Sequence, residues 1–177
     1  AYEDNARLSE EYYGRWTTSA YTISGDDRSA IAYSQPLILP DGTVYGVVGV
    51  ELLTSYVQEK MPYEELQNEK RGAYFLVSTT ADEDAEEFVV SKLVTSSQDS
   101  YALEAPESMM RCERQADGCW LNLHKRDYYA VAMPISLYSR NAPFSDEHWL
   151  LIGAVNSQTL FSFAQNVRHV LTAVVVG

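Results

Sequence analysis

A short turn between two apolar segments constrains the fold of this chain more than any other feature. Pro-Asp-Gly at residues 40–42 joins residues 30–39 to residues 43–51, and both flanks have the composition of β-strands. The Asp-Gly step supplies the positive φ angle that a hairpin turn needs, and the proline fixes the φ angle before it. We therefore predict a β-hairpin over residues 30–51, with its register set by the turn.

The second strand of this hairpin is apolar on both faces. Alternation divides it into two sets, which are Val44, Gly46, Val48 and Val50 on one face, and Tyr45, Val47, Gly49 and Glu51 on the other. A strand of this kind is expected in the middle of a sheet, with both sides covered. Such a ribbon can also form the floor of a pocket for a small molecule.

The carboxylate that closes the strand, Glu51, has two interpretations. It either lies near the positive end of a following helix, which contributes from a few tenths to about 1 kcal/mol, or it faces a polar cavity and meets the cationic group of a ligand. The residues around it leave both open.

Further strand patterns follow along the chain, at residues 73–78, 88–94, 119–124, 127–133 and 148–155. The expected helices are residues 2–13, 52–67 and 160–171, and Pro62 interrupts the second of them. We predict an α+β fold in which PAS-like antiparallel sheets are flanked by helices. A charged link at residues 68–72 divides the chain into expected domains at residues 1–67 and 68–177.

The composition is that of a folded, acidic protein. Over 177 residues, 46% hydrophobic content is enough for packed cores. The net charge of −12 disfavours nucleic acid and anionic membrane surfaces as partners, because both would repel the chain. The 13 tyrosines offer contact area with a polar tip, as recognition surfaces do, although half-buried strand positions account for most of them.

The two cysteines, Cys112 and Cys119, flank an Asp-Gly step at residues 117–118. A turn there brings two short strands together, which favours a disulfide across the hairpin tip and an oxidising compartment. A metal site lacks further ligands at the usual spacing. Two unrelated buried thiols are the other interpretation.

Residues 172–177 form an apolar run that is shorter than the roughly 20 residues needed to span a bilayer. This run is either the first turn of a transmembrane helix or the end of an ordinary core helix. Arg168 and His169, which come just before it, suit a boundary between membrane and water.

No motif for catalysis or for a cofactor stands out. His124, His148 and His169 lack the spacing of metal ligands. The acidic residues 82–87 lack the glycine and the alternating oxygens of a calcium loop, which favours a solvated hairpin loop. We expect no enzyme activity, no cofactor and no metal.

Residues 16–51 resemble a Cache lobe, the PAS-like extracytoplasmic sensor unit of bacterial receptors. The matching elements, in chain order, are Trp16, Tyr21, Ser34-Gln35-Pro36, Asp41-Gly42, the strand at residues 46–50 and Glu51. The later part resembles the membrane-proximal lobe of a double Cache sensor, through Met133-Pro134, a loop at residues 136–147 and a Trp-bearing strand at residues 149–155. The resemblance implies either a truncated membrane-distal lobe or a shortened relative with one full lobe.

The amino-acid-binding Cache subgroup is matched only in part. Tyr2 and Arg7 have a suitable separation, but Ser9 and Glu10 stand where the aromatic residues of the subgroup belong. The tyrosine and the acidic residue of the subgroup's pocket are matched by Tyr21 and Glu51. The ligand class therefore stays broad, as an amino acid, an amine or an organic acid.

The resemblance implies a non-catalytic extracytoplasmic domain of a membrane receptor of the histidine kinase, cyclase or chemoreceptor type. The small-molecule ligand is expected against Trp16, Tyr21, Tyr33 and Glu51. The helix after the last strand is expected to anchor the domain to the membrane and to carry the signal.

Trp120 and Tyr129 have two interpretations, as the lining of a second pocket or as core packing. Two other functions compete with the receptor. One is a structural module that forms a homodimer and binds no ligand, and the other is a secreted hydrolase, for which the sequence has no catalytic set.

Overall fold

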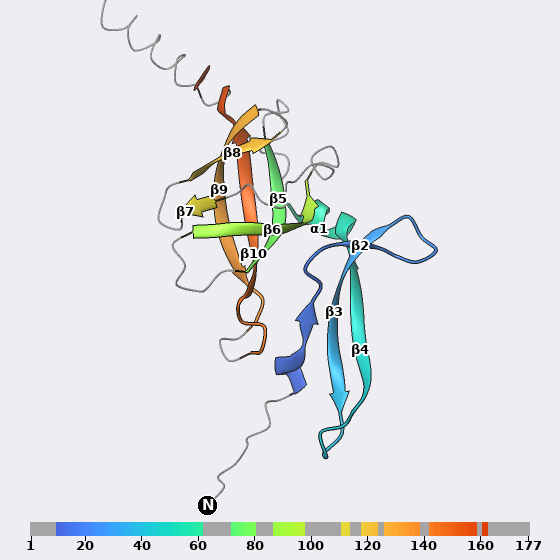
Figure 1. Ribbon diagram of the computed structural model, residues 1–177. Coiled ribbons are helices and arrows are strands. Elements are labelled where there is room, and N and C mark those ends of the chain that lie inside the picture. Colours follow the sequence, from blue (N-terminus) through green and yellow to red (C-terminus); the bar gives the residue numbers. More distant parts are fainter. Residues whose placement is uncertain are drawn as a thin grey trace, which may run out of the picture.

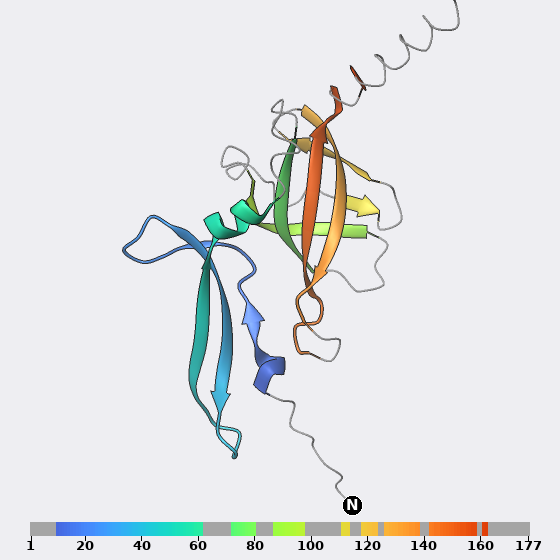
Figure 2. The same ribbon diagram turned by 180° about the vertical axis from the view of Figure 1, so that it is seen from behind.

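The computed structural model describes residues 10–61, 72–80, 87–97, 111–113, 118–123, 126–138, 142–158 and 161–162. Within these ranges the chain forms two antiparallel sheets, with the α-helix α1 (Thr54–Lys60) between them. Figure 1 shows the two sheets side by side, and Figure 2 shows the same arrangement from behind.

The first sheet is built around the predicted hairpin, which is confirmed. Its strands are β1 (Arg15–Trp16), β2 (Tyr21–Thr22), β3 (Ser29–Ile38) and β4 (Val44–Leu53). β3 pairs with β1 and β2 along one edge and with β4 along the other. At the turn, Gly42 has a φ angle of 92°, and the Thr43 N–H donates to Oδ1 of Asp41 at 2.8 Å.

The second hairpin strand is not covered on both sides, so that prediction is wrong. The five large apolar side chains of β4 are between 53% and 67% exposed, and these are Val44, Tyr45, Val47, Val48 and Val50. Among the described residues, β4 pairs with β3 alone, and no element covers its exposed residues 44–50. The composition of the strand therefore indicates burial that this part of the chain does not provide.

The second sheet has the strand order β7-β6-β5-β10-β9-β8. Its strands are β5 (Gly72–Thr80), β6 (Glu87–Ser96), β7 (Arg111–Glu113), β8 (Cys119–Leu123), β9 (Arg126–Ser136) and β10 (Glu147–Asn156). The five strands predicted in this half are confirmed. The sheet curls on itself, so that its end strands, β7 and β8, contact each other.

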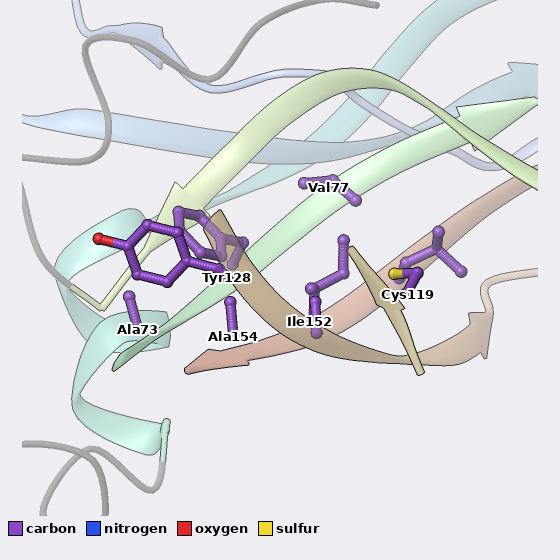
Figure 3. Close-up of a cluster of buried hydrophobic side chains, with 9 residues drawn as sticks. Ala73, Val77, Cys119, Tyr128, Ile152 and Ala154 are labelled. Atoms are coloured by element: carbon purple, nitrogen blue, oxygen red, sulfur yellow. The ribbon is translucent and has the colours of Figure 1, made fainter. Parts of the chain in front are cut away.

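Alternation along the strands of the second sheet separates two hydrophobic clusters. The face inside the curl carries a first cluster, and Figure 3 shows its labelled members, which are Ala73, Val77, Cys119, Tyr128, Ile152 and Ala154. Leu150 belongs to this cluster and is fully buried. The outer face carries Leu76 and Trp149, which pack with Ile31 of β3 in a second cluster. This second cluster joins the two sheets.

Helix α1 also ties the sheets together. The Thr54 hydroxyl donates to the carbonyl oxygen of Ser29 in β3 at 3.1 Å, and the Gln58 side chain donates to the carbonyl oxygen of Ser96 in β6 at 2.9 Å. The helix ends at Lys60, and Met61 precedes Pro62, as expected before a proline.

The fold class is mainly β, so the predicted α+β fold with flanking helices is wrong. Leu52 and Leu53, which the helical pattern included, form the end of β4, and Leu52 pairs with Ile31. The predicted helix at residues 2–13 is described only as the 3-10 helix η1 (Glu10–Tyr13). The rest of it, and most of residues 160–171, lie outside the described residues.

Candidate functional site

A hollow of about 230 Å³ lies where the first sheet meets one end of the second. Residues 15–18 form one wall, the end of β5 and Lys92 in the middle of β6 form another, and the region where β9 ends and β10 begins forms the third. An adjoining hollow of about 410 Å³ shares residues 15–18 and extends over Ser19, Tyr21 and Ser34. The smaller hollow therefore depends on how the first sheet packs against the second, whereas the larger one is lined by residues 15–34 of the first sheet alone.

Trp16 is the centre of this packing. Its ring lies 5.4 Å from the ring of Tyr33 in the neighbouring strand and 5.4 Å from the ring of Trp149 in β10, measured between centroids. Its backbone N–H donates to the hydroxyl oxygen of Tyr138 at 2.9 Å. The Trp16 and Trp149 rings give the hollow an apolar wall that is fixed on both sheets.

An ion pair closes one side of the hollow. Arg15 Nε donates to Oε2 of Glu147 at 3.2 Å, and the Arg15 Nη2 also contacts Oε1 of the same carboxylate. The Arg15 guanidinium also lies 4.8 Å from the ring of Phe144. The hydrogen bond from Arg15 to Glu147 holds the pKa of Arg15 above its ordinary value. Each charge is thus largely engaged by the other.

Two buried polar atoms at the hollow have no hydrogen-bond partner among the described residues, namely Ser78 Oγ and His148 Nε2. Ser78 is 6% exposed and His148 is 8% exposed. An unpaired buried polar group costs about 1–3 kcal/mol, and in native proteins such a group needs an explanation, such as an unseen water or ion. A bound ligand would satisfy these groups in the same way.

The sheet register shows which of the two atoms shares a face with the aromatic wall. Ser78 pairs directly with Trp149 on one side and with Lys92 on the other, so these three side chains lie on one face. His148 precedes Trp149 and so lies on the opposite face, toward the interior of the curled sheet. Ser78 is therefore the buried polar group on the same face as Trp149.

Tyr138 adds a second hydroxyl to the wall. Its oxygen accepts from the Trp16 N–H, and among the described groups it donates to none. Burial raises the pKa of Tyr138 above its ordinary value, so the hydroxyl keeps its proton at neutral pH. The hollow thus offers donors from Ser78 and Tyr138.

The sequence-predicted ligand residues are only partly brought together. Trp16 lines both hollows, Tyr21 lines the larger one, and Tyr33 packs behind Trp16. Glu51 is exposed, lines neither hollow, and precedes the first turn of α1, which has no acidic residue. It accepts a hydrogen bond from the Tyr21 hydroxyl at 2.6 Å, and this bond raises the pKa of Tyr21.

Trp120 and Tyr129 lie away from these hollows, at the opposite end of the second sheet. They form a cross-strand pair with ring centroids 5.4 Å apart, and Trp120 is 57% exposed. The Trp120 ring also stacks on Phe161 at 6.4 Å. A side chain at Gly118 would come within 2.5 Å of the Tyr129 ring, so this pairing requires glycine there.

The predicted disulfide stays a prediction. Cys119 is buried in the first cluster and its thiol is not free. The Cys112 side chain lies outside the described ones, although its backbone belongs to β7, which contacts β8. The acidic residues 82–87 lie outside the described backbone, apart from the last.

The described part of the chain lacks two further features. It contains no group of three or more acidic, histidine or cysteine side chains that could hold a metal. It also contains no helix that is long and apolar enough to cross a membrane. The apolar run at residues 172–177 lies outside the described ranges.

No protein-family model matches this chain, and no curated protein sequence is significantly similar to it. The resemblance to a Cache lobe therefore stays a prediction. Sequence reasoning missed Arg15, Ser78, Lys92, Tyr138 and Glu147 as parts of the site. These residues come together only because strands that are distant along the chain pair, and no local sequence motif indicates this.

Proposed function

We propose that this chain is a non-catalytic sensing module, which binds a small molecule in the hollow between its two sheets and belongs to the extracytoplasmic part of a membrane receptor. The observation that carries the binding site is the buried, unpartnered Ser78 hydroxyl beside the Trp16 and Trp149 rings. The order of residues shared with Cache lobes supports the receptor part of the proposal.

The position of the hollow suits transmission of a signal. β10 begins at the hollow with Glu147 and Trp149, and it runs directly into the helical residues 157–158. A ligand that changes how Trp16 packs on Trp149 would therefore act on the strand that leads to the end of the chain. Such control requires that the ligand bind two arrangements of the sheets with different affinities.

A thermal-shift screen with amino acids, amines, organic acids and purines tests ligand binding. At a concentration 100-fold above the Kd, a ligand should raise the Tm of a domain of this size by about 5–10 °C. The Ser78→Met variant should lose this shift, because the longer side chain fills the hollow and removes the hydroxyl.

Ser55→Met is the matched control, since Ser55 is exposed on α1 and lines neither hollow. This variant should keep the full shift. If no compound class raises the Tm of the wild-type protein, or if the Ser78 variant responds as the wild type does, the binding proposal is wrong.

The exposed strand β4 favours a second candidate function, which is association of two copies of this chain. Natural edge strands are blunted by charges, proline or bulges, but residues 44–50 carry neither charge nor proline and are exposed on both faces. The ladder of β4 with β3 is irregular at one point only, at Tyr45 between Val44 and Gly46. Antiparallel pairing of two β4 strands about a two-fold axis at Val47 would place Tyr45 opposite Gly49 of the partner. An aromatic ring placed over glycine is a favourable cross-strand pair.

Val47→Lys should convert a concentration-dependent dimer into a monomer in analytical ultracentrifugation, because it sets two ammonium groups opposite each other at the axis. Val131→Lys is the control, since Val131 is 52% exposed on β9 and the charge change is the same. A wild-type chain that stays monomeric at all concentrations, or equal effects of both substitutions, would exclude this dimer.

A further inference from the structure

We infer that the ligand of the hollow is a small organic monocarboxylate, whose carboxylate is held by Ser78, Lys92 and Tyr138 and whose apolar body packs against Trp16 and Trp149. This inference rests on the proposed function and adds the ligand class. It comes from the balance of hydrogen-bond donors and acceptors at the hollow.

The hollow has unused donors and a used acceptor. The Ser78 hydroxyl is buried without a partner, and the Tyr138 hydroxyl accepts a bond but donates none among the described groups. The one carboxylate on the wall, Glu147, already takes two contacts from Arg15. A ligand carboxylate can accept from both hydroxyls, whereas a cationic ligand would find the Glu147 carboxylate already engaged by Arg15.

Lys92 supplies the positive charge. It lines the hollow, pairs directly with Ser78 across β5 and β6, and has no ion-pair partner in the described part of the chain. Directly paired residues have Cβ atoms about 4.5–5.5 Å apart, so the ammonium and the hydroxyl can reach one carboxylate. A hydrogen bond between charged groups is roughly twice as strong as a neutral one.

Charge and size limit the ligand to one carboxylate and a short body. Arg15 is held by Glu147, so Lys92 is the one unpaired cation on the described wall, and the net charge of −12 opposes a second negative group. The hollow of about 230 Å³ is smaller than the roughly 300–1,000 Å³ of sites for drug-sized molecules. The tryptophan pair favours an apolar body over an inorganic anion.

Three ligands of nearly identical shape test the inference by isothermal titration calorimetry. Benzoate, benzamide and benzamidine carry a negative, a neutral and a positive group on the same ring. Benzoate should bind at least about tenfold more tightly than benzamide, and benzamidine should bind more weakly than both. Inorganic phosphate, which has no apolar body, should bind more weakly than benzoate.

Substitutions test which residue recognises the negative charge of the ligand. Lys92→Met should lower the affinity for benzoate to that for benzamide and leave the affinity for benzamide unchanged. Lys60→Met should leave both affinities unchanged, because Lys60 lies on α1 over Tyr56 and lines neither hollow. Ser78→Ala should weaken benzoate more than it weakens benzamidine.

The outcomes separate this inference from the proposed function. Binding of benzamide or benzamidine as tightly as benzoate overturns the carboxylate but leaves the binding site in place. An unchanged benzoate affinity in the Lys92 variant also overturns the carboxylate site. If benzoate, benzamide and benzamidine all fail to bind, and no compound of the wider thermal-shift screen binds either, the proposed function itself is wrong.

Discussion

Replacement of Trp149 by alanine is expected to lower the free energy of unfolding by about 3–5 kcal/mol. Trp149 is 8% exposed, and its ring contacts Trp16 in the cluster that joins the two sheets. The variant loses the buried surface of the ring and leaves a void between the sheets, so the transfer and cavity costs add. Urea denaturation followed by circular dichroism measures the change.

Trp120→Ala is the control for this prediction, because it removes the same side chain from a position that is 57% exposed. The substitution removes the ring contacts of Trp120 with Tyr129 and Phe161 at an exposed position, so we expect a loss below about 1.5 kcal/mol. Equal losses for the two variants would contradict the packing of the first sheet on Trp149. The Trp149 variant should also lose the Tm shift caused by ligands.

Replacement of Leu150 by alanine should lower the free energy of unfolding by about 2–5 kcal/mol. Leu150 is fully buried in the first cluster, on the strand between β5 and β9. Neighbouring strands hold the site on both sides, which limits how far the core can collapse into the void, so the upper part of the range is expected.

Leu39→Ala is the matched control, since Leu39 lies at the hairpin turn and is 41% exposed. Its backbone hydrogen bonds to Thr43 and Gly42 survive the substitution, and the loss should stay near 0.5 kcal/mol or less by the rough range for surface positions. A Leu150 variant with a stability close to that of the Leu39 variant would show that the curled sheet lacks the tight core described here.

Local patterns were sufficient for the long strands. The hairpin at residues 30–51 follows from its turn, and five strands of the second sheet follow from runs of β-branched and aromatic residues. β1 and β2 have two residues each and β7 has three, which is too short for any periodicity to show. Their existence depends on β3 and β6, with which they pair.

The fold class and the environment of β4 depend on tertiary structure. The apolar positions at Leu52 and Leu53 suit a helix as well as a strand, and pairing with β3 decides for the strand. The valines of β4 indicate a buried strand on composition alone. Whether any element covers them is a property of the whole assembly and leaves no mark on the local pattern.

The candidate site, too, follows from the local sequence only in part. Trp16 was predicted as a ligand residue and does line the hollow, whereas Glu51 lies outside it. Ser78 and Lys92 come together only through the register of β5 and β6, which shifts on both sides of Ser78. Arg15 and Glu147, which are 132 positions apart, meet only because the first sheet packs on the second.

The central claim, that a small molecule binds between the two sheets, is tested most directly by the indole N–H signals of the three tryptophans in a ¹H–¹⁵N NMR titration with benzoate. Trp16 and Trp149 line the hollow, and Trp120 lies at the other end of the second sheet as an internal control. The structure predicts saturable shifts of the Trp16 and Trp149 signals with an unchanged Trp120 signal. Saturable shifts of the Trp120 signal alone, or no saturable shift with benzoate or any compound of the screen, would contradict it.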